Sequence, residues 1–540
     1  MNIPISIFND VIGPVMRGPS SSHCAAALRI GRIARNLMDN EINQVLVEFD
    51  KHGSLATTHE SQGSDMGLFG GLMGWDTTDE RLVNSTKAIL QANIDVNIKI
   101  GDFHDPHPNT YRITLTNSNE KHSLIAVSTG GGMIEIIKID GMPVKMAGDF
   151  YETLIYINGD GRKVLEVLKG TFENAEILVH EDKGGQLIQI KSEECIIKEL
   201  IVTIQSKGKI RFIKSIAPVL PILSQKDMKV PFSSYNQMLE YDTGRNLPLW
   251  ELAVNYESER GVITHEDVLT RMIEIVKTLR DSIQQGICGT EYEDRILGYQ
   301  CGEFKNQMES GSLLDAGLMN RIILYVTALM EVKSSMGVIV AAPTAGACAA
   351  LPGACLGVSD ALGLSDEDAA KAMMAGGLIG VFIAKGSTFS AEEAGCQAEC
   401  GSASGMVAAA LVTLAGGSTK QAVAAASMAL QNSFGMTCDP VANRVEVPCL
   451  GKNVMAAVNA LACANMAIAE YDPVIPLDEV IEIMDRVGRN IPKELRCTAL
   501  GGLSITKTSK QIEKRLQGNK TDIQSDVQVS PLDSKKDRKK

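Results

Sequence analysis

Three cysteines in the second half of the chain have the residue type and the setting for metal chemistry. They are Cys396, Cys438 and Cys449, and each is flanked by Gly, Pro or Asp. Because those residues break helices, we expect the three thiols to project from helix ends and loops into one space. Three thiolates can hold three irons of a four-iron cluster and leave the fourth iron open. An open iron is a Lewis acid, which is a catalytic arrangement.

The same thiols also have a purely structural interpretation. The chain contains twelve cysteines, and free cysteine is among the residues most often buried in cores. The three candidates are widely spaced and match none of the compact Cys-x-x-Cys signatures. Spacing alone therefore favours core thiols over a cluster.

A serine-rich loop near the N-terminus is the second candidate for chemistry. Residues 18–23 read Gly-Pro-Ser-Ser-Ser-His and precede a helix that periodicity predicts over 25–38. Hydroxyls and free N–H groups at the positive end of a helix dipole make a site for a carboxylate or phosphate. Simple capping of the helix by Ser22 explains the loop equally well.

Length, net charge and cysteine content limit the class of protein to which this chain can belong. A chain of 540 residues is too long for one core and predicts two to four domains. A net charge of −13 does not suit a partner such as nucleic acid or an acidic membrane. Residues 1–4 lack a basic start and an apolar segment, so no secretory signal is expected. Twelve cysteines then favour a reducing, cytoplasmic location, with thiols or metal ligands in place of disulfides.

One apolar stretch resembles a membrane span in composition. Residues 334–358 carry no charge, but Pro343, Pro352 and several glycines interrupt them. A spanning helix would leave backbone groups unpaired at those points. We therefore expect buried loops and helix ends around a site.

Three parts are expected to position these residues. Residues 1–148 mix helices with strands at 44–49, 96–100, 111–115 and 123–128. Residues 150–222 have the βαββαβ order of a small ferredoxin-like domain, with a turn expected at 183–185, a second helix at 193–205 and a last strand at 210–216. Such a domain can bind an effector or serve as a packing spacer. Residues 235–516 are predicted to be helical. Their helices are expected at 316–332, 366–385, 405–415, 419–432, 454–471 and 477–487.

Several long motifs resemble the iron–sulfur L-serine dehydratases (L-serine ammonia-lyases) over nearly the whole chain. In the first part they are residues 13–23 (GPVMRGPSSSH), 107–110 (HPNT) and 128–135 (STGGGMIE). In the second they are 335–337 (SMG), 342–346 (APTAG), 394–399 (AGCQAE), 438–441 (CDPV) and 447–449 (VPC). Many long motifs in one order are far more specific than the cysteines alone.

The resemblance implies an α+β multidomain fold. A mixed α/β part like the β subunit (1–148) would be fused ahead of an all-α catalytic part like the α subunit (235–516). An ACT-type regulatory domain (150–222) would lie between them, and a polar, disordered tail (517–540) would follow. Cys396, Cys438 and Cys449 would hold a [4Fe-4S] cluster. The other cysteines would be mostly core, namely Cys24, Cys195, Cys288, Cys301, Cys348, Cys355, Cys400, Cys463 and Cys497.

The implied reaction is β-elimination from L-serine, giving pyruvate and ammonia. The hydroxyl would bind the open iron while a base removes the Cα proton. His23 would orient or transfer protons together with Ser22, in a small-molecule site expected at the interface of the two main parts. The expected substrate-binding residues are Ser20, Ser21, Ser22, Asn109, Thr344 and Gly346. The family also suggests a homo-oligomer, with a dimer as the expectation.

Some site-lining loops depart from the family pattern. Where the family has a GHGTD-like loop, residues 61–65 read SQGSD, so Gln62 stands in place of a histidine that is a candidate base. Glutamine cannot act as a general base. His59 lies three residues upstream and is the alternative base, or simply a loop histidine. The TGGD-like loop is altered at 298–303, and Cys24 stands where threonine is usual.

These departures keep other functions open. The same cluster chemistry could act on another small β-hydroxy or β-substituted acid. A non-catalytic, cluster-bearing ligand or redox sensor is a second alternative. A pyridoxal-phosphate enzyme is less favoured, because no lysine stands out as a Schiff-base anchor.

Overall fold

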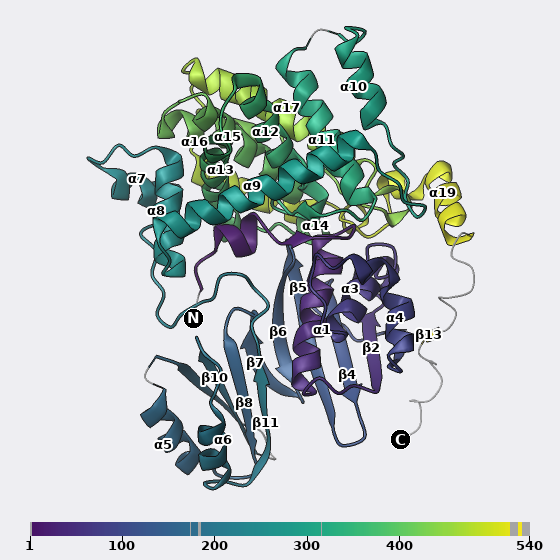
Figure 1. The fold of residues 1–540 in the computed structure, drawn as a ribbon, viewed down its shortest axis with the longest axis vertical. Coiled ribbons are helices and arrows are strands. Elements are labelled where there is room, and N and C mark those ends of the chain that lie inside the picture. Colours follow the sequence, from purple (N-terminus) through teal and green to yellow (C-terminus); the bar gives the residue numbers. More distant parts are fainter. Residues whose placement is uncertain (1–2, 173, 182–184, 315, 519–527, 532–540) are drawn as a thin grey trace.

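The computed structural model describes residues 3–172, 174–181, 185–314, 316–518 and 528–531. Three parts are visible in Figure 1: an N-terminal sheet with its helices (the sheet part), a smaller four-stranded sheet, and a large helical part above both. A mixed α/β N-terminal region and a helical C-terminal region were predicted, and both are confirmed.

The sheet part is a seven-stranded sheet in the order β13-β3-β2-β4-β5-β6-β7. Its strands are β2 (Gln44–Asp50), β3 (Asp95–Gly101), β4 (Thr110–Thr116), β5 (Lys121–Gly130), β6 (Met133–Ile139), β7 (Met142–Met146) and β13 (Gln528–Pro531). Strands β6 and β7 form a hairpin that the sequence analysis did not predict. Alternating buried residues along β4 and β6 give the sheet its buried face.

Two helices of the sheet part pack unusually closely. They are α1 (Ala26–Leu37) and α3 (Ser64–Leu72). A Cβ atom added at Gly67 would collide with the carbonyl oxygen of Cys24, and one at Gly71 with that of Leu28. Only glycine permits this approach. The contact fixes the start of α1, and with it the serine-rich loop.

A segment near the C-terminus pairs with strand β3 at the edge of the sheet. Residues 528–531 were expected in a disordered tail, but they form β13, which pairs in parallel with β3. Backbone hydrogen bonding at an open sheet edge accepts a polar segment regardless of its side chains. The remaining tail, 519–527 and 532–540, lies outside the described residues.

The small sheet has the predicted element order. Its elements are β8 (Tyr151–Ile157), α5 (Arg162–Thr171), β9 (Glu176–Glu181), β10 (Gln186–Ser192), α6 (Lys198–Gln205) and β11 (Ile210–Ile216). The strands run antiparallel in the order β11-β8-β10-β9, and both helices cover one face (Figure 1). Helix α6 begins at Lys198, five residues later than predicted. The turn predicted at 183–185 lies partly outside the described residues.

The helical part is built around buried, Ala- and Gly-rich helices. These include α9 (His265–Cys288), α11 (Leu318–Ser334), α12 (Ala350–Leu362), α13 (Asp366–Gly386), α15 (Ser402–Leu414), α16 (Thr419–Gln431), α17 (Cys449–Ile468) and α18 (Leu477–Asn490). Residues 345–362 and 366–386 are long and apolar enough to span a membrane by composition. However, 83% and 78% of their respective windows are buried within the fold, as in core helices of soluble proteins.

The sheet part and the helical part interlock along a contact that we call the seam. The N-terminal turn η1 (Ile7–Val11) leaves the sheet part and packs on α13, where Gly377 and Gly380 make room for its apolar side chains. Strand β1 (Val15–Met16) then pairs antiparallel with β12 (Ile339–Val340). The seam therefore joins residues more than 300 positions apart.

Candidate active site at the seam

The three predicted cysteines lie at three separate points where helices of the helical part begin or are interrupted. Cys396 precedes the short turn η5 (Gln397–Gly401), and Cys449 is the first residue of α17. Cys438 forms an isolated parallel bridge with Arg496. All three thiols are buried, with exposed fractions of 1–4%. They project from helix ends and a loop, as the flanking Gly and Pro residues predicted.

Two of the thiols meet polar groups from across the seam around a cavity of only ≈10 Å³. Cys438 and Cys449 line it from the helical part, and Ser20 and Ser22 line it from the sheet part. Ligand atoms of Cys396, Cys438 and Glu399 lie within 4.8 Å of one another, close enough to share a metal ion. The structure therefore brings the thiols and the serine-rich loop together.

The buried thiols and a neighbouring lysine influence each other's protonation. Burial raises the pKa of Cys449, and so does its neighbour Cys396. Burial disfavours the charge of Lys452, yet the three thiols together raise its pKa. Lys452 is held beside them, with Nζ 2.5 Å from the Thr437 carbonyl oxygen. A metal would convert such thiols to thiolates, which Lys452 would help to balance. The donors fit an iron–sulfur group, although the side chains must rotate outward to admit one.

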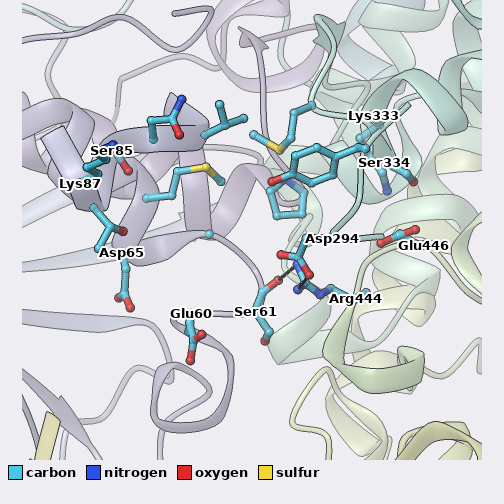
Figure 2. Close-up of a pocket in the computed structure, with 18 residues that line it drawn as sticks. Glu60, Ser61, Asp65, Ser85, Lys87, Asp294, Lys333, Ser334, Arg444 and Glu446 are labelled. Carbon is cyan, nitrogen blue, oxygen red and sulfur yellow. Dashed lines mark hydrogen bonds and ion pairs between the residues drawn. The ribbon is translucent and has the colours of Figure 1, made fainter. Parts of the chain in front are cut away.

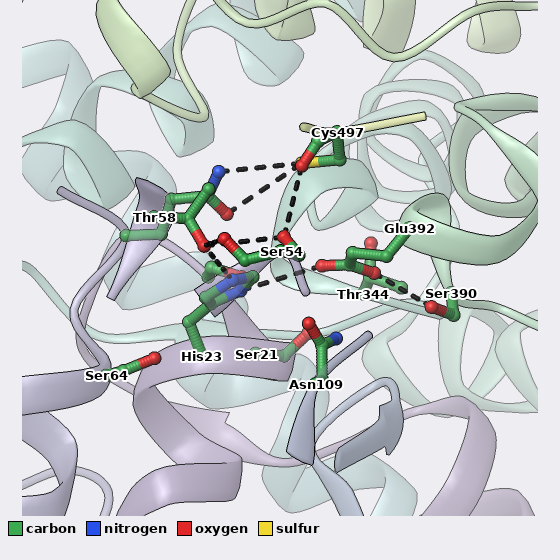
Figure 3. Close-up of polar contacts among 12 residues, drawn as sticks. Ser21, His23, Ser54, Thr58, Ser64, Asn109, Thr344, Ser390, Glu392 and Cys497 are labelled. Atoms are coloured by element: carbon green, nitrogen blue, oxygen red, sulfur yellow. Dashed lines mark hydrogen bonds and ion pairs between the residues drawn. The ribbon is translucent and has the colours of Figure 1, made fainter. Parts of the chain in front are cut away.

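His23 is buried beneath this cavity in a network of hydroxyls and a carboxylate (Figure 3). Its Nε2 lies 2.8 Å from Thr58 Oγ1, and its Nδ1 lies 3.1 Å from Ser20 Oγ. Glu392 Oε1 is 3.6 Å from the same Nδ1. Burial lowers the pKa of His23, which favours the neutral imidazole. A neutral imidazole can pass a proton between its neighbours.

The remaining predicted substrate residues surround the same region. Ser21 Oγ accepts a hydrogen bond from the Ala345 N–H at 3.0 Å, and so ties the serine-rich loop to the helical part. Thr344 donates to Glu399 at 2.6 Å. Gly346 leaves space for that carboxylate, since a Cβ atom there would lie 2.6 Å from Glu399 Oε1.

Asn109 is buried in this region with an unsatisfied amide. Its exposed fraction is 0%, and neither Oδ1 nor Nδ2 has a hydrogen-bond partner among the described residues. Figure 3 places it beside Ser21, facing the side of the site that carries Glu392. An unpaired buried amide costs free energy, so it indicates a missing hydrogen-bonding ligand.

Comparisons with known proteins identify both halves of this site. The family model for the serine dehydratase beta chain matches residues 11–137, and that for the alpha chain matches residues 244–504. A probable L-serine dehydratase alpha chain of Bacillus subtilis is 34% identical over 287 residues, which cover 53% of this chain and 96% of the relative. The chain belongs to the serine dehydratase family. The probable beta chain of the same organism is 40% identical over 153 residues, 28% of this chain and 68% of the relative. An L-serine dehydratase of Helicobacter pylori is 28% identical over 503 residues, 91% of this chain and 96% of the relative.

Gln62, at the position of the family's candidate base, and His59, the alternative base, lie in different places in this serine dehydratase family member. Gln62, which stands where a histidine was expected, lines the thiol cavity. His59 does not line it, because its Nδ1 pairs with Asp65 at 2.8 Å and its ring packs against Phe49. The structure does not bring His59 to the thiols.

Cys497 was expected in the core, and it is buried in one cluster with Cys396 and Cys438. It also lines the thiol cavity, which the sequence did not indicate. Its N–H donates to the Cys438 carbonyl at 2.9 Å, and the Gln62 amide lies 3.5 Å from its sulfur. The contact depends on the parallel bridge at Cys438, which no local sequence pattern announces. Glu392 and Glu399 were likewise missed as site residues, although Glu399 ends the motif at 394–399 and Glu392 lies two residues before it.

A larger pocket of ≈320 Å³ lies beside the thiol cavity on the same seam (Figure 2). It is lined by Pro19, Gly63 and Glu446, the sequence neighbours of three residues that line the cavity. Its cations are Lys87, Lys333 and Arg444, and Arg444 pairs with Asp294 at 2.5 Å. Four carboxylates, among them Asp294 and Glu446, also line the pocket, so it presents both signs of charge and can admit a small zwitterion.

Proposed function

We propose that the protein is an iron–sulfur L-serine dehydratase that converts L-serine to pyruvate and ammonia. The observation that carries this proposal is the meeting of three buried thiols with the serine-rich loop, His23 and Glu392 at one seam. Family membership supports the same reaction, since relatives over most of the chain are named L-serine dehydratase. The enzyme class is a carbon–oxygen lyase.

Cys396, Cys438 and Cys449 would hold the cluster as a [4Fe-4S] group. Bound in this way, the group supplies an open iron that acts as a Lewis acid toward the leaving hydroxyl. Glu399 stays close to Cys396, with 3.7 Å between the carboxylate and the sulfur. Burial raises the pKa of Glu399 to about 7, so it carries less negative charge beside the thiolates.

The sheet part would hold the polar end of L-serine. Ser20 and Ser22 line the cavity, and the unpaired amide of Asn109 offers both a donor and an acceptor. An amino acid carries a carboxylate and an ammonium group, so it would satisfy both ends of that amide. L-serine would approach through the pocket that Lys333, Arg444 and four carboxylates line, since a zwitterion can pair with both signs of charge.

Glu392, supported by His23, would move the Cα proton. Glu392 lines the cavity, accepts a hydrogen bond from Ser390 at 2.8 Å and faces His23 Nδ1. The hydrogen bonds of His23 to Ser20 and Thr58 fix its ring. This assignment gives the general-base role to a group in the cavity, in place of His59.

The remaining parts would have supporting roles. The boundaries 1–148, 150–222, 235–516 and 517–540 stand as the proposed division of the chain. We assign residues 150–222 to an ACT-type, ferredoxin-like regulatory domain, which the strand order β11-β8-β10-β9 supports. A cytoplasmic homodimer that binds neither nucleic acid nor membrane is the proposed state.

Anaerobic purification, counting of iron and sulfide, and a pyruvate assay with L-serine on the same sample test the proposal. We expect four irons per chain and turnover that decays in air. Iron-free protein that still turns over L-serine would contradict the cluster.

A second candidate is the same chemistry on another small β-hydroxy or β-substituted acid. The contact between Gln62 and Cys497 favours it, because both side chains line the cavity and would touch the substrate. A full cluster without pyruvate formation from L-serine, and with turnover of such an acid, would support this alternative.

A further inference from the structure

A cavity of ≈560 Å³ lies where the three parts of the molecule meet. Helix α1 forms one wall with Leu28, Arg29 and Arg32, and helix α9 forms the opposite wall with Arg271 and Ile275. The N-terminal segment and residues 218–221, which follow β11, close its remaining sides. This cavity shares no lining residue with the thiol cavity.

Arg29 is a buried cation that forms no ion pair with any described residue. It is 3% exposed, and its Nη1 donates to the Gly132 carbonyl at 2.6 Å. Its Nε has no partner, and among the described residues no carboxylate oxygen lies within 4.0 Å of its guanidinium. A buried, unpaired charge is unfavourable unless a bound group neutralises it.

The carboxylates around Arg29 do not pair with it, although Glu274 of α9 also lines the cavity. Asp10 is the acid that acts on Arg29 most strongly, but burial raises the pKa of Asp10 and favours its neutral form. Asp76, which also lines the cavity, is paired with Arg32 at 2.7 Å. Burial lowers the pKa of Arg29 to about 10, so the side chain is still charged at neutral pH.

The rest of the cavity is apolar on several sides. Phe8, Ile12, Leu28, Val219 and Ile275 contribute hydrocarbon, and three prolines add rigid walls. A ligand that fits must therefore combine a negative group with an apolar body. Pockets of this size and mixed lining are typical of small-molecule sites.

We propose that this cavity is an effector site for a small organic carboxylate with an apolar body, whose carboxylate pairs with Arg29. Arg271 would reach the same ligand from α9, so binding would hold the sheet part against the helical part. Such a ligand favours whichever arrangement of the two parts brings these arginines together.

The cavity is connected to the candidate active site through backbone hydrogen bonds. Gly13 and Pro14 line the cavity, and both bond to Ala341 across the seam, at 2.9 Å and 3.1 Å. Thr344 follows three residues later and contacts Glu399. A ligand that moves the Gly13–Pro14 wall would therefore move the strand that leads to the thiols. Coupling of this kind changes substrate affinity without touching the substrate.

Calorimetric titration of the full-length protein tests the site. The probes are 3-methylbutanoate and phenylacetate, and their neutral amides are the matched controls. We expect saturable binding of an acid, with the amide at least about tenfold weaker because it lacks the charge. Equal binding of acid and amide, or no binding of either acid, would overturn the proposal.

Variants separate a ligand role of Arg29 from a structural one. Arg29→Met should weaken acid binding at least about tenfold, while its melting temperature stays the same or rises because a buried unpaired charge is gone. Arg271→Met, on an exposed position of α9, provides a second test if Arg29→Met does not fold, and should also weaken binding. Arg162→Met is the matched control, because Arg162 at the start of α5 forms an exposed ion pair with Asp160. This variant should bind the acid as wild type does. Wild-type affinity in both Arg29→Met and Arg271→Met would overturn the proposal.

The measurement does not depend on the proposed reaction. Binding is read from heat, so a chain without cluster or turnover still reports on this cavity. In active enzyme, the acid should change the KM for L-serine in wild type and leave that of Arg29→Met unchanged.

Discussion

The thiol cavity and the arginine cavity lie on the same seam and have opposite electrostatic character. The first gathers thiols and the carboxyl groups of Glu392 and Glu399, with Lys452 behind them. The second places Arg29 in an apolar wall without a carboxylate partner among the described residues. Each is incomplete as protein alone, and each calls for a bound group of the opposite charge.

The difference between the two cavities also lies in how they could be found. Gly, Pro and Asp flank each thiol and mark a functional loop in the sequence. Arg29 is an ordinary residue of an amphipathic helix until its surroundings are known. A buried charge without an ion-pair partner therefore indicates a site that no sequence motif marks.

Removal of one thiol should have the largest effect, since it takes away a ligand. Cys438→Ala should lose the cluster and reduce turnover by more than about 100-fold, because even partners that only orient metal ligands account for 10- to 100-fold. Iron counting and a pyruvate assay measure both. Cys463→Ala, a buried thiol on α17 away from the cavity, is the control and should keep its iron. A full iron complement in Cys438→Ala would remove this thiol from the ligand set.

Neutralising one carboxylate should affect proton transfer while the cluster stays. Glu392→Gln should lower kcat by about 10²- to 10⁴-fold with its iron content intact, as expected for loss of a general base. The adjacent Glu393 pairs with His107 and Arg489 outside the cavity, so Glu393→Gln should stay near wild type. Equal losses in the two variants would argue against a base at Glu392.

A methyl group at the α1–α3 contact should disturb both cavities together, because α1 carries Arg29 and follows the serine-rich loop. Gly67→Ala should cost about 1–3 kcal/mol of folding free energy through overpacking against Cys24. A Cβ atom added at Gly170 in α5 would meet no atom of the described residues within 4 Å, so Gly170→Ala should stabilise by about 0.5–1 kcal/mol. Urea denaturation compares the two; no destabilisation in Gly67→Ala would show that α3 can shift freely.

The smallest effect is expected at the unpaired amide. Asn109→Ala should raise the KM for L-serine by about tenfold, from loss of one or two hydrogen bonds, with little loss of folding free energy because the amide has no partner among the described residues. Asn117→Ala should leave the KM for L-serine unchanged and reduce the folding free energy. Its side chain holds a turn by accepting hydrogen bonds from the N–H groups of Asn119 and Glu120. Steady-state kinetics and thermal melting distinguish the two variants. An unchanged KM in Asn109→Ala would place the substrate elsewhere.

The sequence predicted those features that depend on local chemistry. Strand β11 and the starts of α13, α16 and α18 were predicted at the residue where they occur, because capping residues or alternation mark them. The thiols of Cys396, Cys438 and Cys449 were singled out by the residues beside them. Helix α17 was placed five residues too late, since Pro448 and Gly451 suggested a loop where the helix already begins.

Features that depend on distant contacts could not be predicted in this way. Cys497 reaches the cavity only through the bridge at Cys438, and no local pattern indicates that pairing. The position of His59 away from the thiols follows from its pairing with Asp65, which competes with any role in the cavity. The hairpin of β6 and β7 was missed because the glycines at 130–132 indicate a loop, which hides the alternation of buried and less buried residues in the strands that follow.

The docking of Ile7–Val11 on α13 has a consequence for biosynthesis. At about 5–20 residues per second, the ribosome needs roughly 20–75 s after making this segment to complete residue 386. During that time its apolar side chains have no receptor, and the nascent chain must keep them from other partners. Because the two parts are fused in one polypeptide, α13 is tethered to Ile7–Val11 as soon as it is made. The tether gives each segment a high effective concentration for the other.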